Sequence, residues 1–244
     1  MKKIIIYSSI LVLFAGFLWA CKSDFLEEEP KGFLSGSTLA NAAGVEAALI
    51  GAYAVLDGHN DDNNNWAANP WDWILGSITS DDAYKGSEQT DFPEMTQLEI
   101  YQWSAGNSML NPKWVMSYEG VVRANSTLSL LAEATDISED DRKRIEGEAR
   151  FLRAYYHFEL YKVWGNIPYF TEADEKFVKS NSNVAPLDSV KIDLAAAITL
   201  LPEEQPQVGR ANQLAARAFL GKAYLYGDDK DPAAAKEQLD IVVS

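Results

Sequence analysis

Residues 147–156 read Gly-Glu-Ala-Arg-Phe-Leu-Arg-Ala-Tyr-Tyr and lie within the longest helical pattern of the chain. The pattern begins at Ser138, which Asp141 follows three residues later, a spacing that resembles a capping box. Gly165 marks its end, because glycine is the common residue just after the last turn of a helix. We therefore predict one long helix over 138–164.

Apolar residues at intervals of three and four recur on both sides of this helix. Pro112 stands where a helix begins, and Gly58 and Pro202 stand where helices end. Further helices are predicted at 39–56, 112–134, 187–201, 211–226 and 232–243, with one short helix near 71–78. Strand signals are nearly absent, so the predicted fold class is all-α.

The last two predicted helices contain part of a tetratricopeptide pattern in Leu220-Gly221, Tyr224 and Ala233. Small residues let two antiparallel helices approach closely, and the aromatic residue fills the space between successive pairs. Such a pair cannot bury its own apolar face, so we expect neighbouring units on both sides. The pattern stops in mid-helix at Ser244. We therefore expect a tetratricopeptide-like helical repeat scaffold that is truncated at the C-terminus.

The N-terminus has the pattern of an export signal, with two lysines followed by an apolar run over 4–20. This run is about as long as the shortest membrane-spanning helix. It ends in Leu18-Trp19-Ala20-Cys21, which resembles the bacterial lipobox, although Trp19 is bulkier than the usual residue. We predict a lipoprotein signal peptide at 1–20 and a lipidated Cys21. The alternative is a single membrane anchor helix with an incidental cysteine.

The mature chain is expected to begin with a tether over 21–37 and to continue as one helical domain over 38–244. Without the two lysines of the signal, it has 19 basic and 36 acidic residues, a formal charge of −17. This excess argues against nucleic acid or an anionic membrane surface as the ligand, because both would be repelled. No second apolar run is long enough to cross a membrane.

The segment 57–111 interrupts the helical patterns as a predicted loop insertion. It opens with the polar run His-Asn-Asp-Asp-Asn-Asn-Asn at 59–65, and Trp66, Trp71 and Trp73 follow within eight residues. A loop of this length inside a compact protein is either functional or disordered. Its aromatic content argues against disorder, so we expect a functional segment.

Four stretches, in this order along the chain, resemble the SusD/RagB family of surface-exposed nutrient-binding lipoproteins found in Bacteroidetes. They are 21–27 (Cys-Lys-Ser-Asp-Phe-Leu-Glu), 79–82 (Thr-Ser-Asp-Asp), 147–168 (ending in Trp-Gly-Asn-Ile-Pro) and 209–225 (beginning with Gly-Arg-Ala). The third stretch resembles the most specific motif of the family. Family members continue well past the last residue of this chain, which agrees with the truncation expected above.

The resemblance implies a helical scaffold of four tetratricopeptide-like units with long irregular ligand-binding loops, no enzymatic activity and no cofactor. It implies a surface location, with the protein anchored to the outer membrane through the lipid on Cys21. It also implies two partners, an oligosaccharide ligand and a TonB-dependent (SusC-like) outer-membrane transporter that the lipoprotein covers as a lid. Some relatives take peptides instead, so a peptide ligand stays open. A structural tetratricopeptide adaptor without a small ligand is the other alternative.

Glycan binding without catalysis needs flat aromatic faces for sugar C–H groups and polar side chains for the hydroxyl groups. The loop insertion offers both, and we predict ligand contacts from Asn64, Trp66, Trp71, Asp81, Tyr84 and Lys85. Trp73 is the weaker candidate, because Ile74 beside it has the character of a core residue. Trp103 and Trp114 lie close to helix boundaries, where we expect packing roles.

Three arginines lie in the family-like stretches, where the resemblance implies buried structural partners for acids or carbonyl groups. They are Arg150, Arg153 and Arg210.

An enzyme would need a nucleophile, a base or a metal cluster, and the sequence offers few candidates for any of these. His59 and His157 are far apart, and acylation of Cys21 leaves no free thiol. Asp61-Asp62 allows a glycosidase or a calcium-binding interpretation. Acidic pairs arise readily among 36 acidic residues, however, and no recognised calcium-loop spacing is present. We expect no catalytic residues and no metal site.

Overall fold

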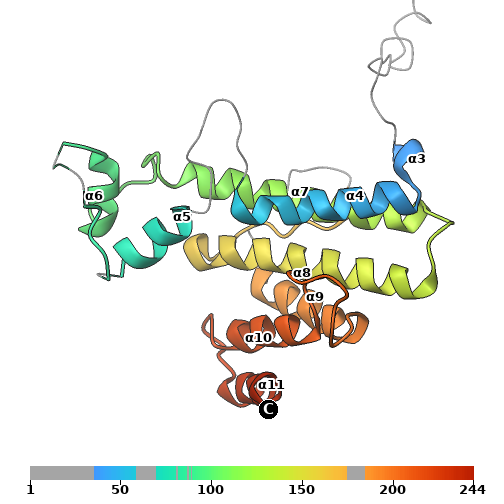
Figure 1. The fold of residues 1–244 in the computed structure, drawn as a ribbon. Helices are drawn as coiled ribbons and strands as arrows, with labels where there is room; N and C mark the ends of the chain where they lie inside the picture. Colours follow the sequence, from blue (N-terminus) through green and yellow to red (C-terminus); the bar gives the residue numbers. More distant parts are fainter. Residues whose placement is uncertain (1–35, 59–69, 81, 87, 89, 175–184) are drawn as a thin grey trace, which may run out of the picture. The chain divides into compact units, whose positions relative to one another are not determined.

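The computed structural model describes residues 36–58, 70–80, 82–86, 88, 90–174 and 185–244 (Figure 1). Every regular element in these ranges is helical, which confirms the predicted all-α class. No helix in the same ranges is long and apolar enough to cross a bilayer. The predicted signal peptide, Cys21 and most of the tether lie outside the described residues.

The described helices follow one another along the chain in this order. They are α3 (Gly36–Leu39), α4 (Ala42–Tyr53), the 3-10 helix η1 (Ala54–Asp57), α5 (Pro70–Trp73), the π-helix η2 (Ile74–Ile78), α6 (Pro93–Glu99), α7 (Asn111–Glu133), α8 (Glu139–Trp164), α9 (Pro186–Leu200), α10 (Gln213–Tyr224) and α11 (Pro232–Val243). The predicted long helices agree with these bounds to within a few residues.

Successive helices from α7 to α11 pack on each other in chain order, and α4 lies beside α7 (Figure 1). This arrangement is that of a helical repeat scaffold, because each hairpin covers the apolar face of the one before it. Gly221 in α10 shows the close approach that the pattern predicted: a Cβ there would lie 2.8 Å from Leu239 Cγ in α11. Only a glycine lets the two helices come this near.

The long helix α8 starts and stops where the sequence predicts. The side chain of Ser138 accepts a hydrogen bond from the backbone N–H of Asp141, and three acidic residues occupy the first turn. Carboxylates there are favoured by the partial positive charge of a helix N-terminus. At the other end, Gly165 has a φ of 66° and its N–H donates to Tyr161 O at 2.8 Å. α8 therefore ends at Trp164.

The main core lies between α4, α7, α8 and α9. Its fully buried members include Leu49, Val121, Leu152, Phe158 and Leu194.

Two ion pairs, both to the buried Asp193, join α8 to α9. Arg153 donates from Nε and Nη2 to the carboxylate of Asp193 at 2.6 and 2.8 Å, and both side chains are buried. Arg153 also donates to Asn125 Oδ1 in α7 at 2.9 Å, and Arg150 reaches Asp193 from the α8 side at 3.1 Å. The predicted structural role of both arginines is confirmed.

The pKa of Asp193 reflects these partners. Burial alone raises the pKa of this carboxyl, but the hydrogen bonds and the charge of Arg153, with help from Tyr169 and Arg150, outweigh burial. The net result is a pKa below the ordinary value of an aspartate. Asp193 is therefore ionised in the folded protein at neutral pH.

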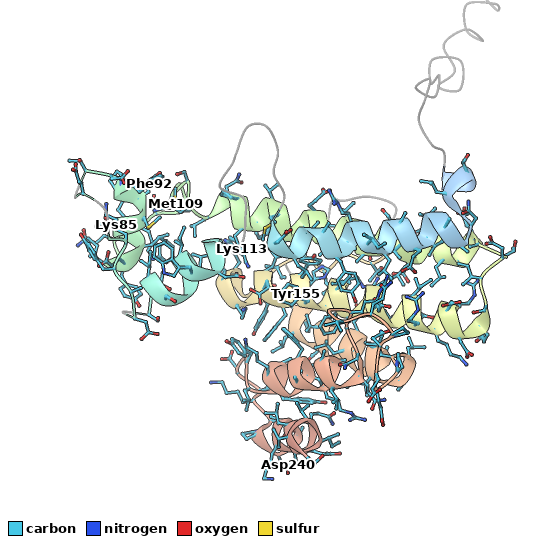
Figure 2. All side chains as sticks on the ribbon, in the orientation of Figure 1. Lys85, Phe92, Met109, Lys113, Tyr155 and Asp240 are labelled. Atoms are coloured by element: carbon cyan, nitrogen blue, oxygen red, sulfur yellow. The ribbon has the colours of Figure 1, made fainter. Side chains whose placement is uncertain are left out.

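A second, smaller core lies beside the start of α7. Ile74 and Ile78 of η2 pack on Met95 and Leu98 of α6, and Phe92 and Met109 lie against this cluster (Figure 2). The sequence predicts loop with one short helix near 71–78 over 57–111, so α6 is a correction. The helix has only seven residues, too short to be stable alone, and its contacts with η2 hold it in place.

Gly120 offers a direct test of the packing between α7 and α8. A Cβ at this position would lie 2.5 Å from three ring atoms of Tyr156, whose hydroxyl donates to Ala52 O at 2.6 Å. The ring is buried and held at both ends, so it cannot move aside. We expect Gly120→Ala to lower the free energy of unfolding by about 1–3 kcal/mol, measured by urea denaturation.

Gly51→Ala is the matched control, because nothing lies within 4 Å of a Cβ on this α4 glycine. It should leave the free energy of unfolding unchanged or raise it by up to ~1 kcal/mol. Equal stability of the two variants would contradict the packing described for Gly120.

The Asp193 ion pairs predict a dependence of stability on pH. Because the folded pKa lies below the unfolded value of about 3.9, the stabilisation is present above that value and is lost as the pH falls through the folded pKa. Asp193→Asn should cost about 3 kcal/mol at pH 7. The difference from the unaltered protein should narrow as the pH falls below about 4. Urea titrations across this range measure it.

Asp188→Asn is the control on the same helix, since Asp188 is exposed and pairs with Lys191 at 3.5 Å. We expect it to change stability by less than about 1 kcal/mol. An Asp193→Asn penalty that stays constant down to pH 3 would contradict the assignment.

Candidate functional site

A pocket of 540 Å³ lies where α7 begins and α8 ends. Its volume is within the range of roughly 300–1,000 Å³ that small-molecule sites occupy. Three tryptophans and several small polar residues line it. They are Trp103, Ala105, Gly106, Asn107, Ser108, Leu110, Asn111, Trp114 and Trp164. We call this the aromatic pocket.

Two of the tryptophans are positioned by the ends of the long helices. Trp114 lies in the first turn of α7, which has a proline at its second position, and Trp164 is the last residue of α8. Because α7 and α8 are antiparallel neighbours, these two ends meet. The two indole rings pack edge to face, with centroids 5.0 Å apart and an interplanar angle of 86°.

Tyr118, one turn further along α7, holds this ring pair in place. Its ring centroid is 4.8 Å from that of Trp114, and its hydroxyl donates to Pro168 O at 2.8 Å. Burial raises the pKa of Tyr118, so the phenol stays neutral and remains a donor at physiological pH. The aromatic wall is therefore fixed before any ligand arrives, which reduces the entropy cost of binding.

The loop 103–110 forms the opposite wall, and Asn107 holds it in shape. This side chain is only 4% exposed. Its Nδ2 donates to Glu94 O at 2.9 Å, and its Oδ1 accepts from the N–H of Met109 at 3.0 Å. Ser108 donates to the carboxylate of Glu94 through its N–H, at 3.1 Å, and through its hydroxyl. The loop is thus bound to the first turn of α6.

Several polar groups of the pocket are not used by the fold. The carboxamide of Asn111 and the indole N–H groups of the three tryptophans have no hydrogen-bond partner among the described residues. Trp103 is 51% exposed, so its ring face is open to a ligand. Flat aromatic faces beside amide and N–H donors are the groups that bind the C–H faces and hydroxyls of a sugar.

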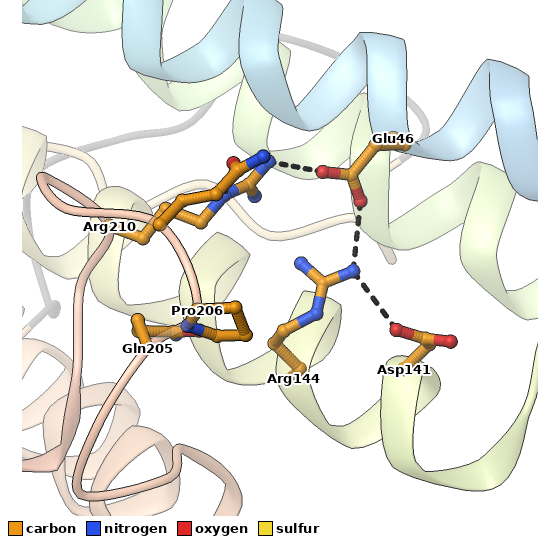
Figure 3. Close-up of a pocket in the computed structure, with 7 residues that line it drawn as sticks. Glu46, Asp141, Arg144, Gln205, Pro206 and Arg210 are labelled. Carbon is orange, nitrogen blue, oxygen red and sulfur yellow. Dashed lines mark hydrogen bonds and ion pairs between the residues drawn. The ribbon is translucent and has the colours of Figure 1, made fainter.

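Two other pockets lined by described residues have a different character, because paired charges line them. In the first, of 220 Å³, Arg144 and Arg210 both bind Glu46, and Asp141 accepts from Arg144 at 3.2 Å (Figure 3). Both arginines also bind the fully buried Glu148. The predicted structural role of Arg210 is confirmed.

The second charged pocket, of 440 Å³, lies between η2 and the ends of α7 and α8. The ammonium of Lys113 is buried there between Asp72, at 2.5 Å, and Glu159, at 3.2 Å. Lys162 donates to the other oxygen of Glu159 at 2.6 Å. Every charge in this group is paired, so the arrangement ties α5 to α7 and α8.

The structure describes only some of the predicted ligand-binding residues. Asn64, Trp66 and Asp81 lie outside the described residues, as does the side chain of Trp71. Tyr84 is 58% exposed. Lys85 is 9% exposed, and its ammonium donates to the backbone carbonyls of Glu88 and Asp91, which closes the loop they form. A ligand-binding role for these six residues stays a prediction.

Trp103, for which a packing role is predicted, is 51% exposed and lines the pocket. Trp114 does pack, but against other pocket residues. Sequence reasoning missed Trp103, Asn111 and Trp164 as one site because they come from three segments that only the antiparallel packing of α7 and α8 brings together. Trp164 carries one available signal, since it lies near the end of the most specific family-like stretch.

No group of three histidine, cysteine or acidic side chains in the described parts of the chain could hold a metal ion. His157 is buried, with Nδ1 against Arg153 O at 2.9 Å and Nε2 accepting from the N–H of Phe170 at 3.1 Å. The imidazole is therefore neutral and structural. His59 lies outside the described residues.

Comparison with curated proteins finds SusD-like relatives. A SusD-like protein of Bacteroides ovatus is 25% identical over 250 residues, which cover 98% of this chain and 42% of that protein. SusD-like protein P2 of Formosa agariphila is 26% identical over 224 residues, 88% of this chain and 42% of that protein. The chain thus spans less than half the length of these relatives.

Solved structures give the same result. A laminarin-binding SusD-like protein superposes with a TM-score of 0.68 at 27% identity, covering 83% of this chain and 43% of that chain. Surface glycan-binding protein A from Bacteroides uniformis gives a TM-score of 0.71 at 26% identity, over 82% and 45% respectively. A family model described as "SusD-like_3: Starch-binding associating with outer membrane" matches residues 24–225. The chain therefore belongs to the SusD-like family.

Proposed function

We propose that this protein binds an oligosaccharide in the aromatic pocket and is a non-catalytic glycan-capture subunit of a nutrient uptake system. The observation that carries the proposal is the group of three tryptophans around unpartnered amide and N–H groups. Two structural relatives whose names state laminarin binding and surface glycan binding support the ligand class.

The pocket can hold a sugar by stacking and hydrogen bonding together. The exposed face of Trp103 takes the apolar C–H face of one ring, and this contact removes apolar surface from water. The carboxamide of Asn111 both donates and accepts, which suits a sugar hydroxyl in either role. None of the pocket-lining residues within the described ranges is a carboxylic acid or a histidine, and a glycosidase needs a pair of carboxyl groups, so the proposed role is capture without bond cleavage.

The proposal extends to location and partners. The lipobox-like ending at Cys21 and the family description that mentions the outer membrane support a lipid-anchored protein on the cell surface. A TonB-dependent transporter of the SusC-like kind is the partner that would receive the captured oligosaccharide. In this arrangement the tether over 21–37 lets the helical domain ride above the transporter.

A peptide ligand and a ligand-free adaptor are the competing functions. A peptide would use backbone hydrogen bonds at an exposed strand or helix face, or charged anchors for its termini. The described lining of the aromatic pocket has no charged side chain, which favours a saccharide over a peptide. Calorimetry against a panel of oligosaccharides and short peptides tests this. Binding of peptides alone would contradict the proposal.

Trp103→Ala tests the stacking contact. We expect the affinity for the tightest-binding oligosaccharide to fall by about tenfold or more. An aromatic side chain that stacks on the ligand contributes a large share of the binding free energy. Trp73→Ala is the matched control, since this tryptophan is also exposed, at 42%, but does not line the pocket. Loss of binding in Trp73→Ala with no change in Trp103→Ala would move the site out of the aromatic pocket.

The residues predicted from the loop insertion are tested separately. We propose that Trp66, Trp71 and Tyr84 extend the ligand surface beyond the aromatic pocket. Their combined replacement by alanine should then weaken binding of long oligosaccharides by about tenfold or more and affect short ones less. Calorimetry with a length series measures this. Unchanged affinity at every length would remove these residues from the site, and unchanged uptake would favour the adaptor.

A further inference from the structure

The aromatic pocket differs from the two charged pockets in one respect that bears on its ligand. Its described lining consists of aromatic, aliphatic and uncharged polar residues. The other two pockets contain arginine, lysine, aspartate and glutamate side chains. A site for a carboxylated or sulfated sugar would be expected to present an arginine or a lysine, because these form charge-assisted hydrogen bonds with anions.

A negative charge adjoins the aromatic pocket. The carboxylate of Glu94 accepts both hydrogen bonds from Ser108, a residue of the pocket wall. Together these hydrogen bonds lower the pKa of Glu94 below its usual value. The bond from the Ser108 hydroxyl has the larger effect, and the bond from its backbone N–H has the smaller. The carboxyl therefore stays ionised at the edge of the pocket in neutral and mildly acidic conditions.

The lysines close in sequence to Trp114 and Trp164 are already paired with carboxylates. Lys113 precedes Trp114 in sequence, but its ammonium is buried and paired with Asp72 and Glu159. Lys162 is paired with Glu159. The first turn of α7 carries a partial positive charge that favours anions, but the full negative charge of Glu94 opposes it. The chain as a whole has a formal charge of −15, which adds repulsion at longer range.

We propose that the aromatic pocket takes uncharged oligosaccharides and discriminates against sugars that carry carboxylate or sulfate groups. This inference rests on the proposed function and specifies its ligand class. Stacking and neutral hydrogen bonds supply the attraction for an uncharged ring. An acidic ring of the same shape meets the carboxylate of Glu94 and finds no cation among the described residues that line the pocket.

The test compares each oligosaccharide with its own acidic derivative. Laminarin, mannan, xylan and galactan oligosaccharides are measured by calorimetry on the full chain. Any that binds and has primary hydroxyl groups is measured again after oxidation of these groups to carboxylates. We expect the oxidised form to bind at least about tenfold more weakly. Its residual binding should strengthen as salt rises from about 20 to about 200 mM, because screening weakens repulsion.

Glu94→Gln isolates the local charge. It should narrow the ratio between neutral and oxidised affinities by about two- to fivefold, and this ratio is insensitive to any general weakening of the site. Glu133→Gln is the matched control, because it removes the same charge from the last residue of α7, roughly 29 Å along the helix from Trp114. It should leave the ratio unchanged.

The outcomes separate this inference from the proposed function. Equal or tighter binding of the oxidised form would overturn the inference and leave glycan binding intact. An unchanged ratio in Glu94→Gln, with weak binding of the oxidised form, would overturn the role of Glu94. Absence of binding by every saccharide would overturn the proposed function and this inference together.

Discussion

The guanidinium of Arg153 joins three helices within the core, and the position of α8 depends on it. It binds Asp193 of α9 through two nitrogens and Asn125 of α7 through a third, and all three side chains are buried. A buried charge of this kind is tolerated only when its donors and its counter-charge are satisfied together. The same contacts therefore fix the relative positions of α7, α8 and α9, which a purely apolar interface would leave less specific.

The aromatic pocket follows from that fixed geometry. α7 and α8 lie antiparallel, and their contacts fix the position of one along the axis of the other. The first turn of α7 therefore meets the last turn of α8, and Trp114 packs on Trp164. Gly165 ends α8 at this point and Pro112 begins α7. A shift of one helical turn in either helix would separate the two rings. The scaffold thus presents a preformed aromatic wall, and the loop around Asn107 completes it.

Local signals explain which parts of the fold the sequence predicts well. The bounds of α8 depend on Ser138 and Gly165, and both act within a few residues of themselves. α6 was missed because its seven residues are held by Ile74 and Ile78, which are distant in sequence. The pairing of Arg153 with Asp193 spans 40 residues, and the family resemblance implied an acid or carbonyl partner without identifying it. Trp103 looked like a packing residue because nothing in its neighbours shows which side of the chain faces solvent.

The proposed saccharide site lies at the junction of α7 and α8. A crystal structure of the full chain with a bound neutral oligosaccharide is the decisive experiment. We expect a sugar ring stacked on Trp103, with hydroxyl groups within hydrogen-bond distance of Asn111 or of the indole N–H groups of Trp114 or Trp164. A ligand bound at another surface, with the aromatic pocket empty, would rule this site out.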